Sequence, residues 1–128
     1  MKLCEGRVAI VTGAGRGLGR AYAIMLAAHG AKVVVNDLGS APNGSGGDLT
    51  PAQEVVDTIR AAGGEAVVNS SDVADWAGSK AMIDQAVDCF GRLDILIHVA
   101  AIFPKREFLT MTAAQWDALH AVNTRGTF

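Results

Sequence analysis

The feature that most constrains this chain is a glycine-rich turn that joins a short apolar run to a helical run. Residues 8–11 are apolar and mostly β-branched, as expected for a strand buried on both faces. A second apolar run, 32–36, follows a helical segment that stops at Gly30. This order predicts one β-α-β unit with a glycine turn at its first strand–helix junction. The glycines of the turn are Gly13, Gly15, Gly17 and Gly19.

A glycine turn in this position can bind a pyrophosphate. Glycine lets the backbone approach the anion closely, and the helix that follows offers free N–H groups and a partial positive charge. Asp37 stands 18 residues after Gly19, where a carboxylate can bind the adenosine ribose hydroxyls. The strand, turn, helix and acid together predict a dinucleotide site. The alternatives are a turn without a ligand and, for Asp37, a turn or helix-cap residue.

The spacing of the turn is Thr12-Gly13, three residues, Gly17, one residue and Gly19. In this spacing the chain resembles the short-chain dehydrogenase/reductase family, whose cofactor turn reads T-G-x-x-x-G-x-G. The run 33–39 is similar to the hydroxyacyl-CoA dehydrogenase part of peroxisomal multifunctional enzymes and their bacterial relatives. The resemblance extends over essentially the whole chain and covers the front half of the family's fold. It implies a nicotinamide cofactor and hydride transfer with a secondary alcohol or ketone, including the 3-hydroxyacyl type.

Composition excludes several other classes of protein. With 128 residues, half of them hydrophobic, the chain can form one domain with a core. The net charge is −2 and the 11 basic residues are scattered, which gives no footprint for nucleic acid. The N-terminal apolar run ends at Thr12, too short for a signal-peptide core or a membrane span. Cys4 and Cys89 form no C-x-x-C, so we expect two unpaired thiols and a cytoplasmic protein without membrane partners.

Caps mark where the later helices begin. A turn-rich surface loop, 38–48, precedes Thr50, which is expected to cap a helix with Pro51 at its first position and Gln53 closing a capping box. Glycines 63–64 end this helix. Apolar spacing predicts the inner faces of three helices. They are, in chain order, Leu18, Tyr22, Met25, Leu26 and His29 in the helix before this one; Val55, Val56 and Ile59 in this helix; and Met82, Ile83, Ala86, Val87 and Phe90 in the helix after it.

The last two helices have equally clear starts. Asp75 is expected to cap the first of them, which ends at Gly91. Thr112 and Gln115 form a capping box that opens the second, which is expected still to run at Phe128. Its pattern includes Trp116, Leu119 and Asn123.

Two more strands, 65–69 and 93–99, complete the order β-α-β-α-β-α-β-α. This order predicts an α/β fold, a doubly wound parallel sheet of the Rossmann type with strand order 3-2-1-4. The second mononucleotide half is absent from the 128 residues. We therefore expect residues 1–128 to be a dinucleotide-binding domain that is incomplete at its C-terminus, and a homo-oligomer when complete.

The resemblance implies a set of cofactor contacts. Asp37 should favour NAD over NADP, because a 2′-phosphate would meet a carboxylate of the same sign. Arg16 would favour NADP if it paired with that phosphate; the alternative is that Arg16 is a solvated surface charge. Asp72 resembles the family's adenine contact, supported by the backbone of Val73, with a plain loop aspartate as the alternative. The expected cofactor-binding residues are Thr12, Gly13, Gly15, Arg16, Gly17, Leu18, Gly19, Asp37, Leu38, Asp72, Val73 and Ala100.

The segment after the fourth strand departs from the family pattern. Where the family has Asn-Asn-Ala-Gly, this chain has His98-Val99-Ala100-Ala101. Ala101 adds a methyl group where the family's backbone passes close to the cofactor. His98 is expected to be a buried or edge histidine rather than a new catalytic group.

Asn123 is the candidate catalytic residue, because it matches the family's helix asparagine that holds a water in the proton relay. A polar residue on the wet face of the helix is the alternative. The family's acid/base is a Tyr with a Lys four residues later and a nearby Ser. Tyr22 is the single tyrosine here and position 26 is Leu, so we expect these catalytic groups beyond position 128 and no turnover by this chain alone. His29 and His120 have no ligand-spaced partners, and no metal is predicted.

Three hypotheses follow from the sequence. The chain is the front portion of an NAD-dependent short-chain oxidoreductase, a non-catalytic dinucleotide-binding module, or a dimerising half-domain that needs a partner chain.

Overall fold

A computed structural model describes residues 1–39 and 50–128. Its centre is a parallel sheet of four strands in the order β3-β2-β1-β4, which confirms the predicted Rossmann-type topology. Parallel neighbours require crossover connections, and here each crossover is a helix. The strands are β1 (Val8–Thr12), β2 (Lys32–Asn36), β3 (Glu65–Asn69) and β4 (Ile95–His98).

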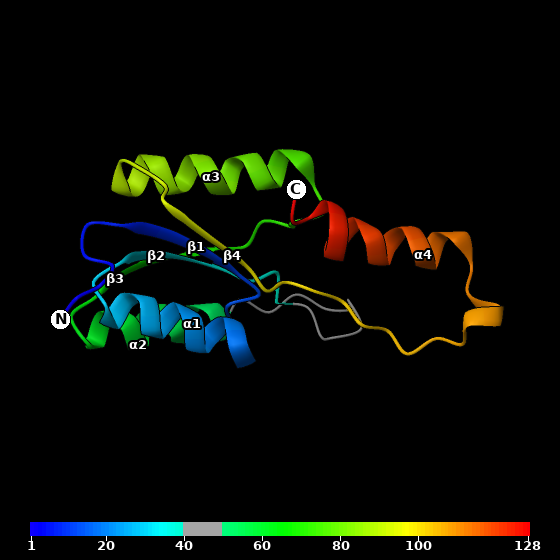
Figure 1. Ribbon diagram of the computed structural model, residues 1–128, viewed down its shortest axis with the longest axis horizontal. Coiled ribbons are helices and arrows are strands. Elements are labelled where there is room, and N and C mark those ends of the chain that lie inside the picture. The colour runs from blue at the N-terminus through cyan, green and yellow to red at the C-terminus, as the bar shows by residue number, and fades with distance from the viewer. Residues whose placement is uncertain (40–49) are drawn as a thin grey trace.

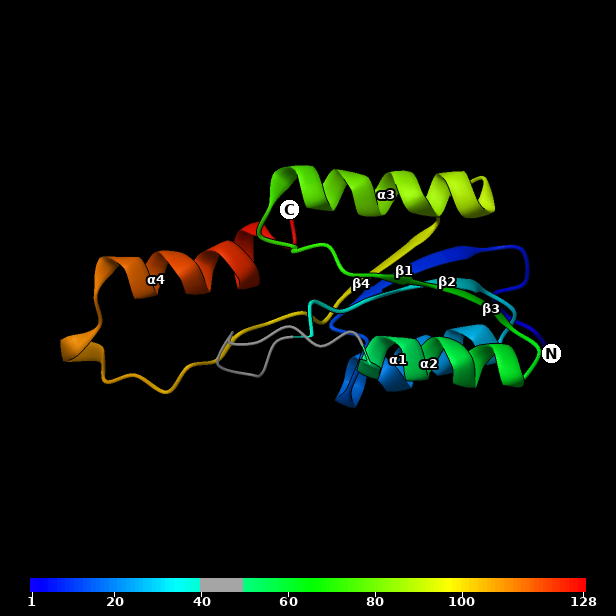
Figure 2. The same cartoon turned by 180° about the vertical axis from the view of Figure 1, so that it is seen from behind.

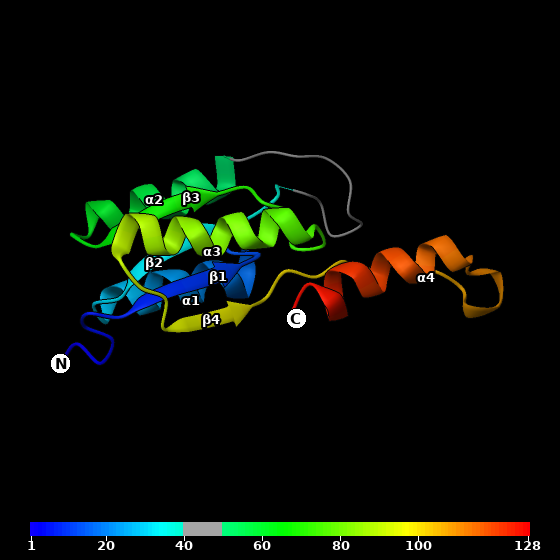
Figure 3. The ribbon, with the colours of Figure 1, turned by 90° about the horizontal axis from the view of Figure 1, so that it is seen from above.

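Helices cover both faces of the sheet. Figure 1 shows α1 and α2 on one face and α3 on the other, and Figure 2 shows the same three layers from behind. Seen from above in Figure 3, β4 lies at one edge of the sheet and α4 extends beyond the carboxyl ends of the strands. The helices are α1 (Gly17–Ala28), α2 (Thr50–Ala61), α3 (Trp76–Phe90) and α4 (Ala113–His120), with a 3-10 turn Phe108–Thr110 and a π-helical turn Ala121–Arg125.

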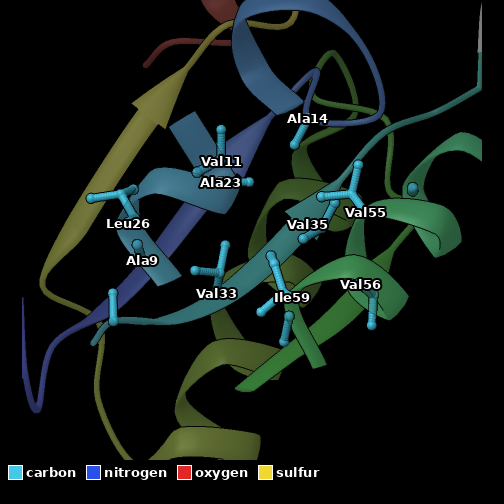
Figure 4. Close-up of a cluster of buried hydrophobic side chains, with 13 residues drawn as sticks. Ala9, Val11, Ala14, Ala23, Leu26, Val33, Val35, Val55, Val56 and Ile59 are labelled. Carbon is cyan, nitrogen blue, oxygen red and sulfur yellow. The ribbon is translucent and has the colours of Figure 1, made fainter. Parts of the chain in front are cut away.

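The hydrophobic core has one part on each face of the sheet. On the face of α1 and α2, alternate side chains of β1 and β2 pack against the buried sides of both helices (Figure 4). On the opposite face, Val8, Ile10 and Val34 pack against Met82 and Ala86 of α3. Every residue of β1 is buried, as expected for a central strand covered on both faces.

The predicted caps of the later helices are confirmed. The Asp75 carboxylate accepts the Gly78 N–H at 2.7 Å at the start of α3, and Gly91 ends this helix with φ +83°. At α4, the Thr112 hydroxyl accepts the Gln115 N–H and the Gln115 side chain accepts the Thr112 N–H. This reciprocal pair is the predicted capping box.

Two of the predicted inner faces were partly wrong. In α1, Leu18 is 65% exposed and Met25 50% exposed, whereas the small residues Gly19 and Ala23 face the sheet with Leu26. In α3, Ile83 is 47% exposed and Val87 45% exposed, and the buried residues are Met82 and Ala86. In α1 the small residues Gly19 and Ala23 occupy the contact with the sheet, and in both helices apolar spacing alone made the predicted face wider than the buried one. The inner face predicted for α2, namely Val55, Val56 and Ile59, is confirmed.

Three predicted boundaries also differ from the structure. The fourth strand is shorter than 93–99 and spans Ile95–His98. The last helix does not run regularly to Phe128, because its hydrogen bonding changes to a π-helical turn at Ala121–Arg125. Thr50 is the first residue of α2 rather than a residue before it. Most of the predicted loop 38–48 lies outside the described residues.

Within the described ranges, no helix is both long and apolar enough to cross a membrane. Both cysteines are free, as expected; Cys4 is partly buried and Cys89 is exposed.

Candidate dinucleotide site

The glycine turn brings the end of β1 against the segment after β4. Gly13 has φ +62°, a conformation that favours glycine. A Cβ at Gly13 would lie 2.8 Å from the Ala100 nitrogen, and one at Gly19 would overlap the Gly13 carbonyl. Glycine is therefore required at both places by close approach of backbone to backbone. At Gly17 (φ +55°), in contrast, nothing among the described residues lies within 4 Å of an added Cβ.

The first turn of α1 is open to an anion. The N-cap residue is Arg16, whose side chain makes no capping hydrogen bond in the described structure, and no acidic residue occupies the first turn. The N–H groups at a helix start need partners, and the helix dipole favours a negative group there. This arrangement suits a phosphate.

Asp37 is held against the glycine turn. One carboxylate oxygen accepts the Gly15 N–H at 2.8 Å, and the other accepts the Gly39 N–H at 2.7 Å. The Asp37 N–H in turn donates to the carbonyl of Asn69 at 3.1 Å. A carboxylate has about four acceptor positions, so both oxygens can still accept hydroxyl hydrogens from a ligand.

The Thr12 hydroxyl joins β1 to the segment after β4. Its oxygen accepts the N–H of Val99 and of Ala100, each at 3.1 Å. It also lies 3.0 Å from Nδ1 of His98, its partner in the sheet register. Burial lowers the pKa of His98, and the nearby backbone of Val122 and Ala100 offsets part of this shift. His98 is therefore a half-buried histidine on the edge strand, as predicted.

Asn123 holds the backbone of the segment that leaves β4. Its Oδ1 accepts the Ile102 N–H and its Nδ2 donates to the Ile102 carbonyl, both at 2.9 Å. Both ends of the side-chain amide are thus engaged within the chain. Asn123 lies in the π-helical turn, where irregular backbone hydrogen bonding is common near functional sites.

A cleft of about 480 Å³ opens at the carboxyl ends of the strands. In open α/β sheets this is where ligands bind. It brings together seven of the predicted cofactor residues, whereas Thr12, Gly15, Gly17, Leu18, Gly19 and Asn123 do not line it. The seven that line it are Gly13, Arg16, Asp37, Leu38, Asp72, Val73 and Ala100.

The described residues bring together no group of three or more His, Cys, Asp or Glu that could hold a metal ion.

Comparison with known proteins agrees with this geometry. A family model described as short chain dehydrogenase matches residues 7–128. The chain belongs to the short-chain dehydrogenase family. This family binds nicotinamide dinucleotides, and the cleft lies where its Rossmann-type sheet would place one.

Individual relatives support the same assignment. A peroxisomal multifunctional enzyme type 2 of Drosophila melanogaster is 48% identical over 97% of this chain and 20% of its own length. A putative short-chain type dehydrogenase/reductase of Mycobacterium tuberculosis is 44% identical over 97% of the chain and 43% of its own length. The crystal structure of a short chain dehydrogenase from Mycobacterium avium has a TM-score of 0.87 and 49% identity, covering 98% of this chain and 44% of that one. The chain therefore spans less than half the length of each of these relatives.

Sequence reasoning missed an amide network behind the cleft. Asn36 donates to Asn69 Oδ1 at 2.7 Å and to the Ser71 carbonyl at 2.9 Å. Asn69 donates to Gln85 Oε1 at 2.7 Å, and Gln85 donates to the Val68 carbonyl at 3.0 Å. The network fixes the ends of β2 and β3, which carry Asp37 and Asp72. The signal that could have found it is an asparagine that directly follows three apolar residues at the last position of each strand.

The cleft also has walls that the sequence did not indicate. They come from the segment after β4 and from α4 with its π-helical turn, and include Ala101, Ile102, Ala118, Ala121 and Val122.

Proposed function

We propose that the cleft is the binding site for NAD and that the chain is the cofactor-binding part of an NAD-dependent short-chain oxidoreductase. The observation that carries this proposal is the position of Asp37, which lines the cleft and is held by the N–H of Gly15 inside the glycine turn. One residue thus connects the pyrophosphate-binding turn to the place where a ribose would lie.

The residues present fit a dinucleotide. The open first turn of α1 and the unobstructed Gly17 would receive the pyrophosphate. The Asp37 carboxylate would accept the ribose hydroxyl hydrogens, and its charge would oppose a 2′-phosphate. Asp72 would receive the adenine amine, since it lines the cleft and its Oδ1 is held by the Ala74 N–H at 2.8 Å.

The proposed reaction is hydride transfer between the nicotinamide and a secondary alcohol or ketone. The 3-hydroxyacyl class is supported by the 48% identity with the fly multifunctional enzyme. A proton must also move to or from the substrate oxygen, and a positioned acid/base contributes typically about 10²–10⁴-fold to such a rate. We propose that this group lies outside the 128 residues. Asn123 would act near it, by fixing the backbone of Ile102 beside the cleft.

The test has two arms. NAD should bind the chain in a calorimetric titration, and the chain should not oxidise secondary alcohols or 3-hydroxyacyl thioesters. Turnover should appear when a C-terminal half from a family member is appended. Turnover by the short chain that disappears in His98→Ala would contradict the proposal, and NAD binding without turnover in the extended chain would favour a non-catalytic module.

Compartment and assembly belong to the same proposal. We retain the cytoplasm and a homo-oligomer as the expected state of the complete protein. The fly and mouse relatives are named peroxisomal enzymes, so fractionation of cells that express the full-length protein should distinguish the two compartments.

A further inference from the structure

The Thr12 hydroxyl has three hydrogen-bond partners, and together they fix the direction of every hydrogen bond around it. The N–H groups of Val99 and Ala100 can act only as donors, and both point at Thr12 Oγ1 from 3.1 Å. A hydroxyl has two acceptor positions and one hydrogen to donate. Because both acceptor positions are used, the hydroxyl hydrogen must go to Nδ1 of His98, 3.0 Å away.

This direction fixes the form of the histidine. A neutral imidazole that accepts at Nδ1 carries its hydrogen on Nε2. That nitrogen is buried and has no hydrogen-bond partner among the described residues. Protonation would place a second N–H on Nδ1, facing an oxygen whose acceptor positions are already occupied. One of the two backbone N–H groups would then lose its bond to Thr12.

No charged group in the described structure offsets this cost. His98 lies on the sheet face that α3 covers, where Lys80 pairs with Asp84, and Asp88 is exposed. On the π-helical turn, His120 bonds to Thr124 and Arg125 to the Ala74 carbonyl.

Tyr22 and Cys4 pack in the core on the opposite, α1 side of the sheet. Beyond Thr12, the groups that act on the imidazole are the backbone of Val122 and Ala100, which raise its pKa and offset part of the larger lowering by burial.

We propose that His98 is a positioning residue of the dinucleotide site. In its neutral form, Nδ1 of His98 accepts the hydrogen bond of the Thr12 hydroxyl, so that the Thr12 oxygen can accept the N–H groups of Val99 and Ala100 and hold them beside Gly13. Protonation of His98 weakens this attachment of Val99 and Ala100. The inference rests on the proposed function, because Ala100 and Gly13 line the cleft assigned to NAD. The consequence is an NAD affinity that falls as the pH drops.

The sign and the size of the effect follow from linkage. The pKa of His98 in the folded chain is lowered by burial, so it lies below the usual value of about 6.5. Above that value the neutral form prevails and affinity is constant. Below the folded pKa, the dissociation constant should rise about tenfold for each unit of pH.

The first experiment needs no cofactor. Long-range nitrogen–proton NMR correlations in the uniformly ¹⁵N-labelled chain report which ring nitrogen carries the hydrogen. We expect the Nε2–H form at neutral pH, and amide shifts of Val99 and Ala100 that titrate with the same midpoint as the imidazole. An Nδ1–H form, or amide shifts of Val99 and Ala100 that do not change as the imidazole titrates, would overturn the inference.

The second experiment measures NAD affinity from pH 5 to 8 in matched variants. His98→Asn restores the family residue and cannot titrate, so its affinity should stay flat where the wild type weakens. His29→Asn is the control, since His29 also has a buried, unpartnered ring nitrogen but lies at the far end of α1; it should keep the wild-type profile. A pH dependence that persists unchanged in His98→Asn would contradict the inference.

The two experiments separate this inference from the proposed function. Absence of NAD binding at every pH would refute the function, while the coupled titration of His98, Val99 and Ala100 would still test the hydrogen-bond arrangement. If His98→Asn fails to fold, His98→Gln provides a second untitratable side chain for the same comparison.

Discussion

At the scale of single residues, Asp37 combines an observed structural role with a proposed binding role at the same carboxylate. Its oxygens hold the N–H groups of Gly15 and Gly39, and the same carboxylate faces the cleft. Its charge would therefore act on the proposed cofactor, while its hydrogen bonds shape the turn. A substitution changes both, so the informative quantity is the ratio of affinities for two cofactors, because a loosened turn affects both equally.

We expect Asp37→Ala to narrow a preference for NAD over NADP by about ten- to a hundredfold. Hydrogen bonds to charged groups are worth about 1.5–3 kcal/mol, and each 1.4 kcal/mol is about a factor of ten. Fluorescence titration with both cofactors gives the ratio. Asp57→Ala removes a carboxylate on the exposed side of α2 and should leave the ratio unchanged. Equal affinity of the unmutated chain for NAD and NADP would refute the role given to Asp37.

Substitutions at Gly13 and Gly17 can distinguish the cost of backbone strain from the cost of a steric clash with another segment. Both have positive φ, but only at Gly13 would a Cβ meet another segment, at Ala100. We expect Gly17→Ala to lower the free energy of unfolding by about 1–2 kcal/mol through strain alone. Gly13→Ala should cost at least about 1 kcal/mol more, as measured by denaturant unfolding. Equal losses would show that the contact with Ala100 does not constrain the turn.

At the scale of elements, the amide network ties two strands to a helix. Asn36 and Asn69 end β2 and β3, and Gln85 projects from α3 to meet them. Asn36 is 1% exposed and Asn69 8% exposed. Buried amides of this kind stabilise a structure only when each partner is satisfied, so the network also sets the positions of the strand ends that carry Asp37 and Asp72.

We expect Asn69→Ala to lower the free energy of unfolding by about 2–3 kcal/mol. It would remove the Asn69 oxygen that accepts from the Asn36 amide and the Ser71 N–H, and the amide that donates to the Gln85 carbonyl oxygen; Asn36 would keep only its bond to the Ser71 carbonyl. Unsatisfied buried polar groups cost about 1–3 kcal/mol each. Urea unfolding followed by circular dichroism measures the change. Asp84→Ala is the control, since its bond to Lys80 is exposed, and it should change stability by less than about 0.5 kcal/mol. A loss for Asn69→Ala as small as that of the control would contradict the account.

At the scale of the whole molecule, the sheet ends in an apolar edge strand. In the described structure β4 pairs with β1 on one side, and Leu96 is 55% exposed. Beyond the sheet, α4 has no buried residue and Trp116 is 51% exposed. An unpaired apolar edge is a template for pairing with another chain.

We therefore expect the 128-residue chain to associate with itself as its concentration rises. Sedimentation velocity over a hundredfold concentration range measures the association. Leu96→Lys places a charge on the edge strand and should weaken it, whereas Met25→Lys, at an exposed position of α1 away from the edge, should not. A sharp monomer boundary at every concentration, together with cooperative melting, would count against this expectation.

The sequence alone determined the element order, the strand order and most of the nucleotide-binding turn. Local chemistry sets these features: β-branched runs form buried strands, glycines permit the turn, and caps such as Asp75 and Thr112 start helices whatever surrounds them. The family spacing of Thr12, Gly13, Gly17 and Gly19 added the cofactor class. The identities of Asp37 and Asp72 as cleft residues followed from their places after β2 and β3.

The tertiary structure decided what depends on contacts between distant segments. The inward faces of α1 and α3 are set by how closely each helix approaches the sheet, so Leu18 and Ile83 are exposed although their spacing is apolar. The roles of Thr12, His98 and Asn123 emerged only when residues more than 20 positions apart met in hydrogen bonds. Periodicity describes one element at a time, whereas the donors and acceptors of a site are paired by the packing of several.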